Sequence, residues 1–162
     1  MIILGIDPGI ADTGYGVIEQ NKKGDLLCLA YGSIKTPAGE LLAKRLFSLA
    51  EQLSAVIKKY QPERAAIEEL FFCNNAKTAL VVGQARGVAM LICSQAGLLP
   101  MSFTPLQVKQ AVTTYGGANK QQVQKMVKIL LNLKEIPKPD EAADALAIAI
   151  CAAGNGDLLT KK

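Results

Sequence analysis

Residues 2–9 read IILGIDPG, an apolar run that ends in an acid, a proline and a glycine. A short apolar run bounded by turn residues is typical of a buried β-strand. Asp7 is therefore expected at the carboxyl end of a strand, where the sheet would hold its carboxylate in a fixed direction. This acid is the first candidate for a functional side chain, although an acid at this position can also simply end the strand.

The rest of the chain predicts strands and helices around this first strand. Further strands are expected at residues 13–19, 26–36, 64–70 and 101–104. Helices are expected at residues 40–60, 76–96, 105–114, 120–133 and after Pro139. This order predicts an α/β fold, with a five-stranded mixed sheet flanked by helices.

The size and composition favour one compact unit. The chain has 162 residues, of which 50% are hydrophobic, so residues 1–156 are expected to form a single domain and residues 157–162 a disordered tail. We find no apolar run long enough to span a membrane and no signal peptide, so we expect a cytoplasmic protein. The four cysteines have no CxxC spacing, which favours buried free thiols over disulfides or zinc ligands.

The sequence contains no histidine, which restricts the chemistry available to it. Histidine is the commonest general base and the usual nitrogen ligand of zinc. Hydrolysis would therefore depend on carboxylates or, less readily, on Lys, Tyr or Cys. Carboxylates favour Mg²⁺ or Mn²⁺ over zinc. The net charge of +4 fits a nucleic-acid partner but is also common in other proteins.

Further acids lie in two apolar contexts. Glu68 follows AAI in an expected strand, where an unpaired charge is costly to bury unless a cation compensates it. Glu69 would point to the opposite face, and strand alternation alone does not decide which of the two acids faces Asp7. At the start of the last helix, Asp140 fits the N-cap, and Glu141 and Asp144 are spaced to share one face.

These helix acids could equally form a solvated, capped first turn. Together with the missing histidine, however, the acids predict an all-carboxylate site. Two divalent ions about 4 Å apart at such a site could hold the attacking water and the leaving oxygen of a phosphodiester. The residues therefore predict a metal-dependent phosphodiesterase.

Six sequence blocks in order, over nearly the full chain, carry a resemblance to the RuvC family. They are GIDPG at 5–9, TGYG at 13–16, AIE at 66–68, GQARG at 83–87, QVKQ at 107–110 and AADALAIA at 142–149. The resemblance implies an RNase H-like fold and a homodimer that resolves Holliday junctions in DNA recombination and repair by paired symmetric nicks. It also implies Mg²⁺ as cofactor, with Mn²⁺ as a substitute, and a RuvA–RuvB branch-migration complex as partner.

The resemblance also assigns site residues. The family's catalytic, metal-binding acids fall on Asp7, Glu68 and Asp144, and the fourth falls on Glu141. Relatives carry aspartate or histidine at that fourth position, so the longer glutamate puts its geometry in doubt and Asp140 is a possible substitute.

By the same resemblance, Lys109 and Lys120 match positions that contact junction phosphates, and Phe71 is a candidate for stacking on an exposed base. Taken alone, these lysines could be ordinary solvated surface. Phe71 and Phe72 could both instead anchor their loop to the core. Arg86, with Gln84, could either contact DNA or form a dimer interface, and the sequence does not distinguish these roles.

Three other functions compete with this interpretation. A different RNase H-like nuclease could share the fold and the acids but cleave RNA or hybrid duplexes. An actin-like ATPase would explain the glycine-rich segment at 5–16, but the chain is too short for its two lobes and has no second phosphate motif. A non-catalytic junction-binding module would not need clustered acids.

Overall fold

The computed structural model describes residues 1–70 and 76–155. Its strands are β1 (Ile2–Asp7), β2 (Asp12–Gln20), β3 (Leu26–Lys35), β4 (Arg64–Glu68) and β5 (Met101–Phe103). The helices in these ranges are α1 (Leu42–Tyr60), α2 (Ala76–Gln95), α3 (Pro105–Thr113), α4 (Lys120–Leu130) and α5 (Asp140–Gly154). The order and types of the elements expected from the sequence are confirmed, and their ends shift by a few residues.

The strands form one mixed sheet in the order β3-β2-β1-β4-β5. Strands β1, β2 and β3 pair antiparallel as consecutive hairpins, and β4 and β5 add in parallel on the other side of β1. β1 is therefore the central strand, and four of its six residues are buried. The predicted five-stranded mixed sheet is confirmed.

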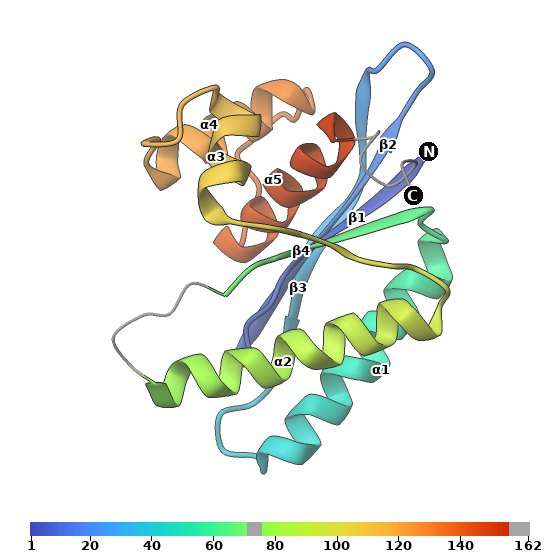
Figure 1. Ribbon diagram of the computed structural model, residues 1–162, viewed down its shortest axis with the longest axis vertical. Helices are drawn as coiled ribbons and strands as arrows, with labels where there is room; N and C mark the ends of the chain where they lie inside the picture. Colours follow the sequence, from blue (N-terminus) through green and yellow to red (C-terminus); the bar gives the residue numbers. More distant parts are fainter. Residues whose placement is uncertain (71–75, 156–162) are drawn as a thin grey trace.

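Helices cover both faces of the sheet (Figure 1). α5 lies directly on β1 and β2, with α3 and α4 packed against it, and α1 and α2 lie together on the opposite face. Each face has its own hydrophobic core, because side chains alternate along a strand. Ile3 and Ala66 belong to the core under α5, whereas Leu4 and Ile67 belong to the core under α1 and α2.

Local sequence signals explain where the helices of the α5 layer begin. Thr104 and Gln107 form a capping box at the start of α3, and Asn119 and Gln122 form another at the start of α4. In each box two backbone N–H groups that would lack a partner in the first turn are satisfied by side chains. These caps fix the residues at which α3 and α4 begin.

The N-cap prediction for α5 is wrong. Pro139, not Asp140, is the N-cap residue, and no side chain caps this helix. The backbone of Pro139 is extended, and its carbonyl oxygen accepts hydrogen bonds from the N–H groups of Ala142 and Ala143. Asp140 lies inside the first turn, so its carboxylate is free to turn toward neighbouring lysines.

Two expectations about the whole chain can be compared with the described residues. Cys28, Cys93 and Cys151 are free thiols, buried or half-buried, as predicted, and Cys73 lies outside the described residues. Within residues 1–70 and 76–155, none of the helices has the length and apolar character needed to cross a bilayer.

Candidate active site

Asp7 and Glu68 end two neighbouring parallel strands. β1 and β4 pair up to Ile6 and Ile67, so the next residue of each strand is an acid at the same edge of the sheet. Alternation places Glu68 on the same face as Ala66, which packs in the α5 core. The two carboxylates therefore lie side by side under α5.

The structure separates the two glutamates that the strand pattern left open. Glu68 is half-buried. Its charge raises the pKa of Asp7, and the charge of Asp144 raises the pKa of Glu68. Glu69 is exposed, and its backbone N–H donates to the carbonyl oxygen of Phe103 at 2.8 Å. Glu68 is therefore the acid that faces Asp7.

Glycines in the sheet allow α5 to bring its acids to this edge. Gly14 is paired with Asp7 across β1 and β2, and a Cβ atom at Gly14 would collide with the backbone carbonyl of Glu141. Gly5 likewise faces the backbone of α5, at Ala145 and Ala149. Because these strand positions lack side chains, the helix backbone packs directly on the sheet. This close approach places the first turns of α5 above the ends of β1 and β4.

Burial and mutual repulsion raise the pKa values of three carboxylates at this edge of the sheet. Burial, followed by the nearby charges of Glu68 and Asp144, raises the pKa of Asp7 to about 7. Burial and the charge of Asp144 raise the pKa of Glu68 to about 6. The pKa of Asp144 is also raised, by burial above all, although Lys120 opposes the shift. Glu141 adds to the repulsion on Asp7. Such a cluster is stabilised by any added positive charge.

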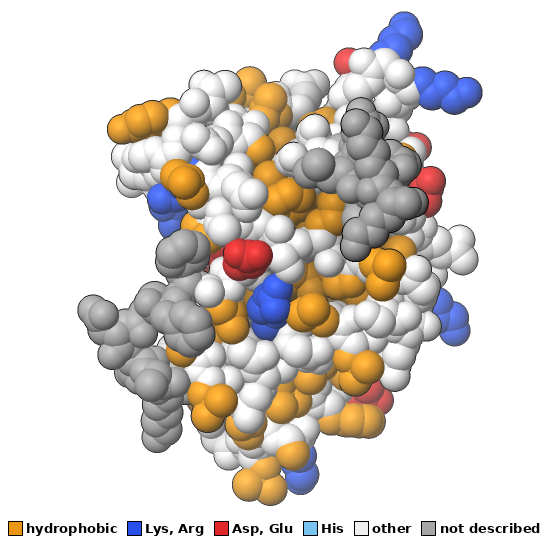
Figure 2. All heavy atoms as spheres, viewed as in Figure 1, with side chains coloured by type: hydrophobic (Ala, Val, Ile, Leu, Met, Phe, Trp, Pro, Cys, Tyr) orange, Lys and Arg blue, Asp and Glu red, His pale blue; other side chains and the backbone are white. Residues whose placement is uncertain are grey.

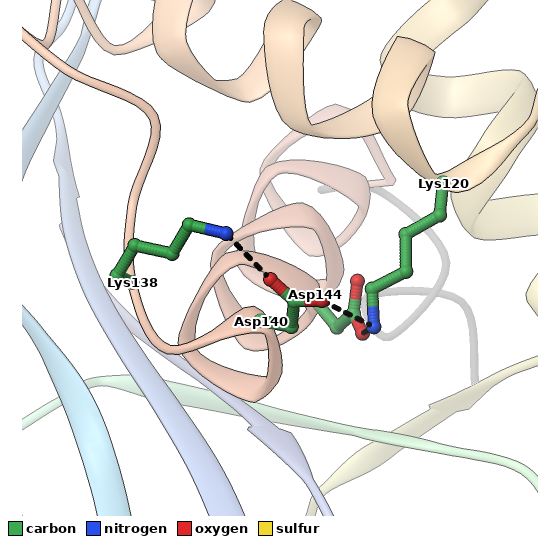
Figure 3. Close-up of polar contacts among 4 residues, drawn as sticks. All are labelled: Lys120, Lys138, Asp140 and Asp144. Carbon is green, nitrogen blue, oxygen red and sulfur yellow. Dashed lines mark hydrogen bonds and ion pairs between the residues drawn. The ribbon is translucent and has the colours of Figure 1, made fainter.

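Lys120 supplies one positive charge at the edge of this cluster (Figure 3). Its Nζ atom lies 3.0 Å from Oδ2 of Asp144 and 3.5 Å from Oδ2 of Asp140. Burial alone would lower the pKa of Lys120, but its bonds to the two aspartates raise it. Asp140 also accepts a hydrogen bond from Lys138 at 3.1 Å, and that bond lowers the pKa of this exposed carboxyl. Asp140 therefore points to the lysines.

A cavity of about 210 Å³ opens beside the acids. It is lined by Glu68, Pro105, Val108, Lys109, Lys120, Val123, Asp144 and Ala147. Two carboxylates and two ammonium groups thus share one hollow with apolar walls, and Lys109 and Lys120 come from α3 and α4. Figure 2 shows one face of the molecule, on which a few charged side chains lie among many hydrophobic ones.

The structure brings most of the predicted site residues together. Asp7, Glu68, Glu141 and Asp144 interact electrostatically, and both predicted lysines line the cavity next to two of them. Arg86 is not among the residues that line the cavity. Phe71 lies outside the described residues.

The acids fit a hard divalent cation in donor type, since each offers carboxylate oxygens and their charges repel each other. In residues 1–70 and 76–155 no three acidic or cysteine side chains already stand in the arrangement of a metal site. The positive charge beside Asp144 is that of Lys120. The electrostatic coupling among the carboxylates identifies Asp7, Glu68, Asp144 and Glu141 as the candidates for holding such an ion.

A network that the sequence did not reveal holds the loop after Asp7. The hydroxyl of Thr13 donates to the carbonyl oxygen of Gly9, and that of Thr36 donates to the carbonyl oxygen of Ile10. Arg45 of α1 donates to the hydroxyl of Thr36 at 3.0 Å and to its carbonyl oxygen at 3.2 Å. Both threonines are buried. The only sequence signal is a hydroxyl residue near the start of β2 and another directly after β3, which is too common to interpret.

We expect the raised pKa of Asp7 to make the protein less stable as pH rises when divalent ions are chelated. The folded state holds the proton of Asp7 more tightly than the unfolded chain, so this stabilisation is present at pH 4 and is lost toward pH 7. Asp7→Asn removes the ionisable group. In EDTA at pH 8 it should raise Tm by roughly 5 °C, and at pH 5 by less.

Thermal unfolding at the two pH values checks this, with Glu51→Gln on the exposed side of α1 as the control for removal of a carboxylate. An equal change in Tm at both pH values for Asp7→Asn would contradict a raised pKa of Asp7.

Comparison with known proteins relates this geometry to a family. The family model for crossover junction endodeoxyribonuclease RuvC matches residues 3–152. A protein of that name from Desulfitobacterium hafniense is 55% identical over 162 residues, covering 99% of this chain and 97% of the relative. One from Caldanaerobacter subterraneus subsp. tengcongensis is 52% identical over 161 residues, with the same coverage.

Solved structures agree with the sequence comparison. Thermus thermophilus RuvC superposes with a TM-score of 0.90 at 36% identity, covering 99% of this chain and 98% of that one. The same protein in complex with Holliday junction substrate gives a TM-score of 0.88 at 34% identity, over 96% and 95% of the two chains. The expected RNase H-like fold is confirmed. The chain belongs to the RuvC family of crossover junction endodeoxyribonucleases.

Proposed function

We propose that this protein is a Mg²⁺-dependent endonuclease that resolves Holliday junctions by paired symmetric nicks. Family membership supports this reaction. The structural observation that supports it in this chain is that Asp7, Glu68 and Asp144 interact electrostatically beside a cavity that two lysines also line. Carboxylates without a histidine suit Mg²⁺, with Mn²⁺ as a substitute.

In this mechanism each group of the chain has a definite task. Asp7, Glu68, Asp144 and Glu141 hold the divalent ions. Bound there, such ions supply an activated water and stabilise the charge on the leaving oxygen. Asp7 and Glu68 aim their carboxylates accurately, because each is the last residue of a sheet strand.

Lys109 and Lys120 would bind the phosphates on either side of the cleaved bond. Both line the cavity beside Glu68 and Asp144, so a phosphate brought to the acids would also meet two ammonium groups. Lys120 is already oriented by Asp144 at 3.0 Å.

The direct test is cleavage of a synthetic four-way junction by the purified protein, with and without Mg²⁺. We expect symmetric nicks only with the metal and only on the junction. A linear duplex and an RNA–DNA hybrid of the same sequence are the controls. Cleavage of the hybrid in preference to the junction would show a different nuclease of this fold, and junction binding without any cleavage would show a binding module.

We predict that the two lysines contact DNA phosphates. Lys109→Ala or Lys120→Ala should reduce the slope of log K against log salt for junction binding by about 1, because each phosphate contact releases about one counterion. Titration of a labelled junction at several salt concentrations measures the slope. Lys44→Ala, an exposed lysine on α1, is the control.

An unchanged slope for either cavity lysine would show that its side chain does not contact phosphate. Loss of cleavage with normal affinity and normal slope would instead assign that lysine to stabilisation of the transition state.

We also propose a homodimer, because two symmetric nicks require two sites related by a two-fold axis. α2 offers a matching surface. Leu80, Gln84, Gly87 and Leu91 are all exposed and lie at steps of three and four, so they form one stripe along the helix. In the single chain Leu80 is 66% exposed and Leu91 56%. Two exposed leucines on one stripe favour a second protein surface that covers them.

We predict that a charge on this stripe separates the subunits. Leu80→Glu or Leu91→Glu should raise the dimer Kd by roughly 100-fold, since a carboxylate would be buried without a partner. Sedimentation velocity at micromolar concentration measures it. Leu27→Glu, on the edge strand β3 with a similar exposure of 57%, is the matched control. A wild-type protein that is monomeric and still resolves junctions would refute the dimer.

The proposal extends to the organisation and setting of the protein. Residues 1–156 would act as one nuclease domain in the cytoplasm, with a RuvA–RuvB branch-migration complex as partner. The support for the single domain is that both hydrophobic cores pack on one sheet. Co-sedimentation with such a complex on a four-way junction tests the partner.

A further inference from the structure

Arg86 on α2 reaches across to the end of the strand that carries Glu68. Its Nε atom donates to the backbone carbonyl oxygen of Glu68 at 3.0 Å, and Nη2 donates to Oγ of Ser102 at 2.7 Å. Nη1 lies 3.2 Å from Sδ of Met90, one turn along the same helix. Each nitrogen of the guanidinium therefore has an acceptor within the chain, and the side chain joins α2, β4 and β5.

The carbonyl that Arg86 binds belongs to the last residue of β4. The β1–β4 ladder stops one residue earlier, at Ile6 and Ile67, so β1 does not hold Glu68. On its other side, Glu68 is the last residue of β4 paired with β5, opposite Phe103. The N–H of the same peptide, that of Glu69, is bonded to Phe103, so β5 holds one side of this peptide. The Glu68 carbonyl points to the other side, where β1 does not pair with it. A further bond to this carbonyl therefore helps to fix the orientation of the peptide and of the Glu68 side chain.

Arginine is suited to fix such an end. Its guanidinium is planar and permanently charged, so it can bind several acceptors in one rigid arrangement, and bonds from a charged donor are stronger than neutral ones. Ser102 pairs with Ile67 across β4 and β5, so the second acceptor lies on the strand beside the first. We call these bonds from Arg86 to the Glu68 carbonyl and to Ser102 the Arg86 clamp, which spans the last two pairs of the β4–β5 ladder.

We propose that Arg86 is a positioning residue that fixes the backbone of Glu68, so that its carboxylate stays directed toward Asp7 and Asp144. This inference rests on the proposed function, in which Glu68 holds a divalent ion. Groups that orient metal-binding side chains from behind typically change metal affinity or activity by about 10- to 100-fold when removed. Arg86 would act in this way from the face of the sheet opposite the cavity.

The test compares Arg86→Met, which keeps the apolar stem but removes the guanidinium, with Arg86→Lys and Ser102→Ala. For Arg86→Met we expect kcat on the junction and affinity for Mn²⁺ each to fall by about 10- to 100-fold, with junction affinity in Ca²⁺ unchanged. Mn²⁺ affinity is measured on the purified protein by electron paramagnetic resonance of the free ion. Arg86→Lys should restore part of both losses, because an ammonium can still reach the Glu68 carbonyl.

Ser102→Ala is the matched control, since it removes one acceptor of the guanidinium and leaves the bond to Glu68 in place. It should stay close to the wild type. Hydrogen exchange gives a readout independent of metal: the N–H of Glu69, bonded to Phe103, should exchange faster in Arg86→Met and not in Ser102→Ala. Arg86→Lys gives the same comparisons if the methionine variant does not fold.

Two results would overturn the proposal. Weaker junction binding with unchanged kcat and Mn²⁺ affinity would make Arg86 a DNA contact, and an unchanged exchange rate at Glu69 would show that no clamp exists. Glu68→Gln distinguishes these from failure of the proposed function. If Glu68→Gln leaves Mn²⁺ affinity unchanged, Glu68 holds no ion. If it weakens Mn²⁺ binding while Arg86→Met does not, only the positioning role fails.

Discussion

Asp7→Asn, Glu68→Gln and Asp144→Asn are each expected to reduce cleavage of a four-way junction by about 1,000-fold or more. The amides keep the size and one acceptor oxygen but lose the charge that would hold a divalent ion in the proposed mechanism. Metal ions supply several kcal/mol of transition-state stabilisation, and about 1.36 kcal/mol corresponds to a factor of ten in rate. Single-turnover cleavage measures the loss, and folding and junction affinity should remain nearly normal.

Glu69→Gln is the matched control, because the neighbouring glutamate is exposed and turned away from Asp7. It should cleave at nearly the wild-type rate. If Asp7→Asn and Glu68→Gln both retain Mg²⁺-dependent nicking, the carboxylate mechanism is wrong.

The fourth acid can be tested in the same assay. Glu141 is among the charges that raise the pKa of Asp7, whereas the carboxylate of Asp140 is bonded to Lys138 and Lys120. We therefore expect Glu141→Gln to lose activity and Asp140→Asn to retain most of it. The reverse result would make Asp140, rather than Glu141, the fourth ligand.

Gly14→Ala is expected to have the second largest effect. The added Cβ would collide with the backbone carbonyl of Glu141, which cannot move without lifting the first turn of α5 from the sheet. Overfilling a packed contact costs about 1–3 kcal/mol of stability. The rate of cleavage should also fall, by about 100-fold, because even a shift near 1 Å in catalytic geometry can reduce a rate by that factor. Thermal unfolding and single-turnover cleavage measure the two losses.

Gly39→Ala is the control for this substitution. No atom lies within 4 Å of a Cβ at Gly39, and its backbone needs no positive φ. It should leave both stability and cleavage unchanged. A Gly14→Ala protein that is destabilised but cleaves normally would show that the position of the first turn of α5 is not critical.

Much of the fold could be predicted from local patterns in the sequence. The apolar run 2–6 forms β1, and the repeat of apolar residues every three or four positions forms α1, because burial of a strand or of one helix face imposes those periods. The acids at strand ends were visible for the same reason. Asp7 follows a buried run directly, and Glu68 ends another.

Helix ends were less predictable. Asp140 looked like an N-cap because short acidic side chains favour that position, yet Pro139 takes it and Asp140 binds Lys138. The preference of a residue type for a cap is worth about 1 kcal/mol, which a neighbouring ion pair and the local path of the chain can override.

By itself, the sequence determined the order of the elements and placed candidate acids at the ends of two strands and at the start of the last helix, because these depend on residue types and short periods. Only the tertiary structure decided that Glu68 rather than Glu69 faces Asp7, that Lys120 pairs with Asp144, and that Arg86 binds the end of β4. Each of these depends on which surfaces pack together across the sheet. A period of two or of 3.6 residues places a side chain on a face, but only long-range packing selects the partner that the face meets.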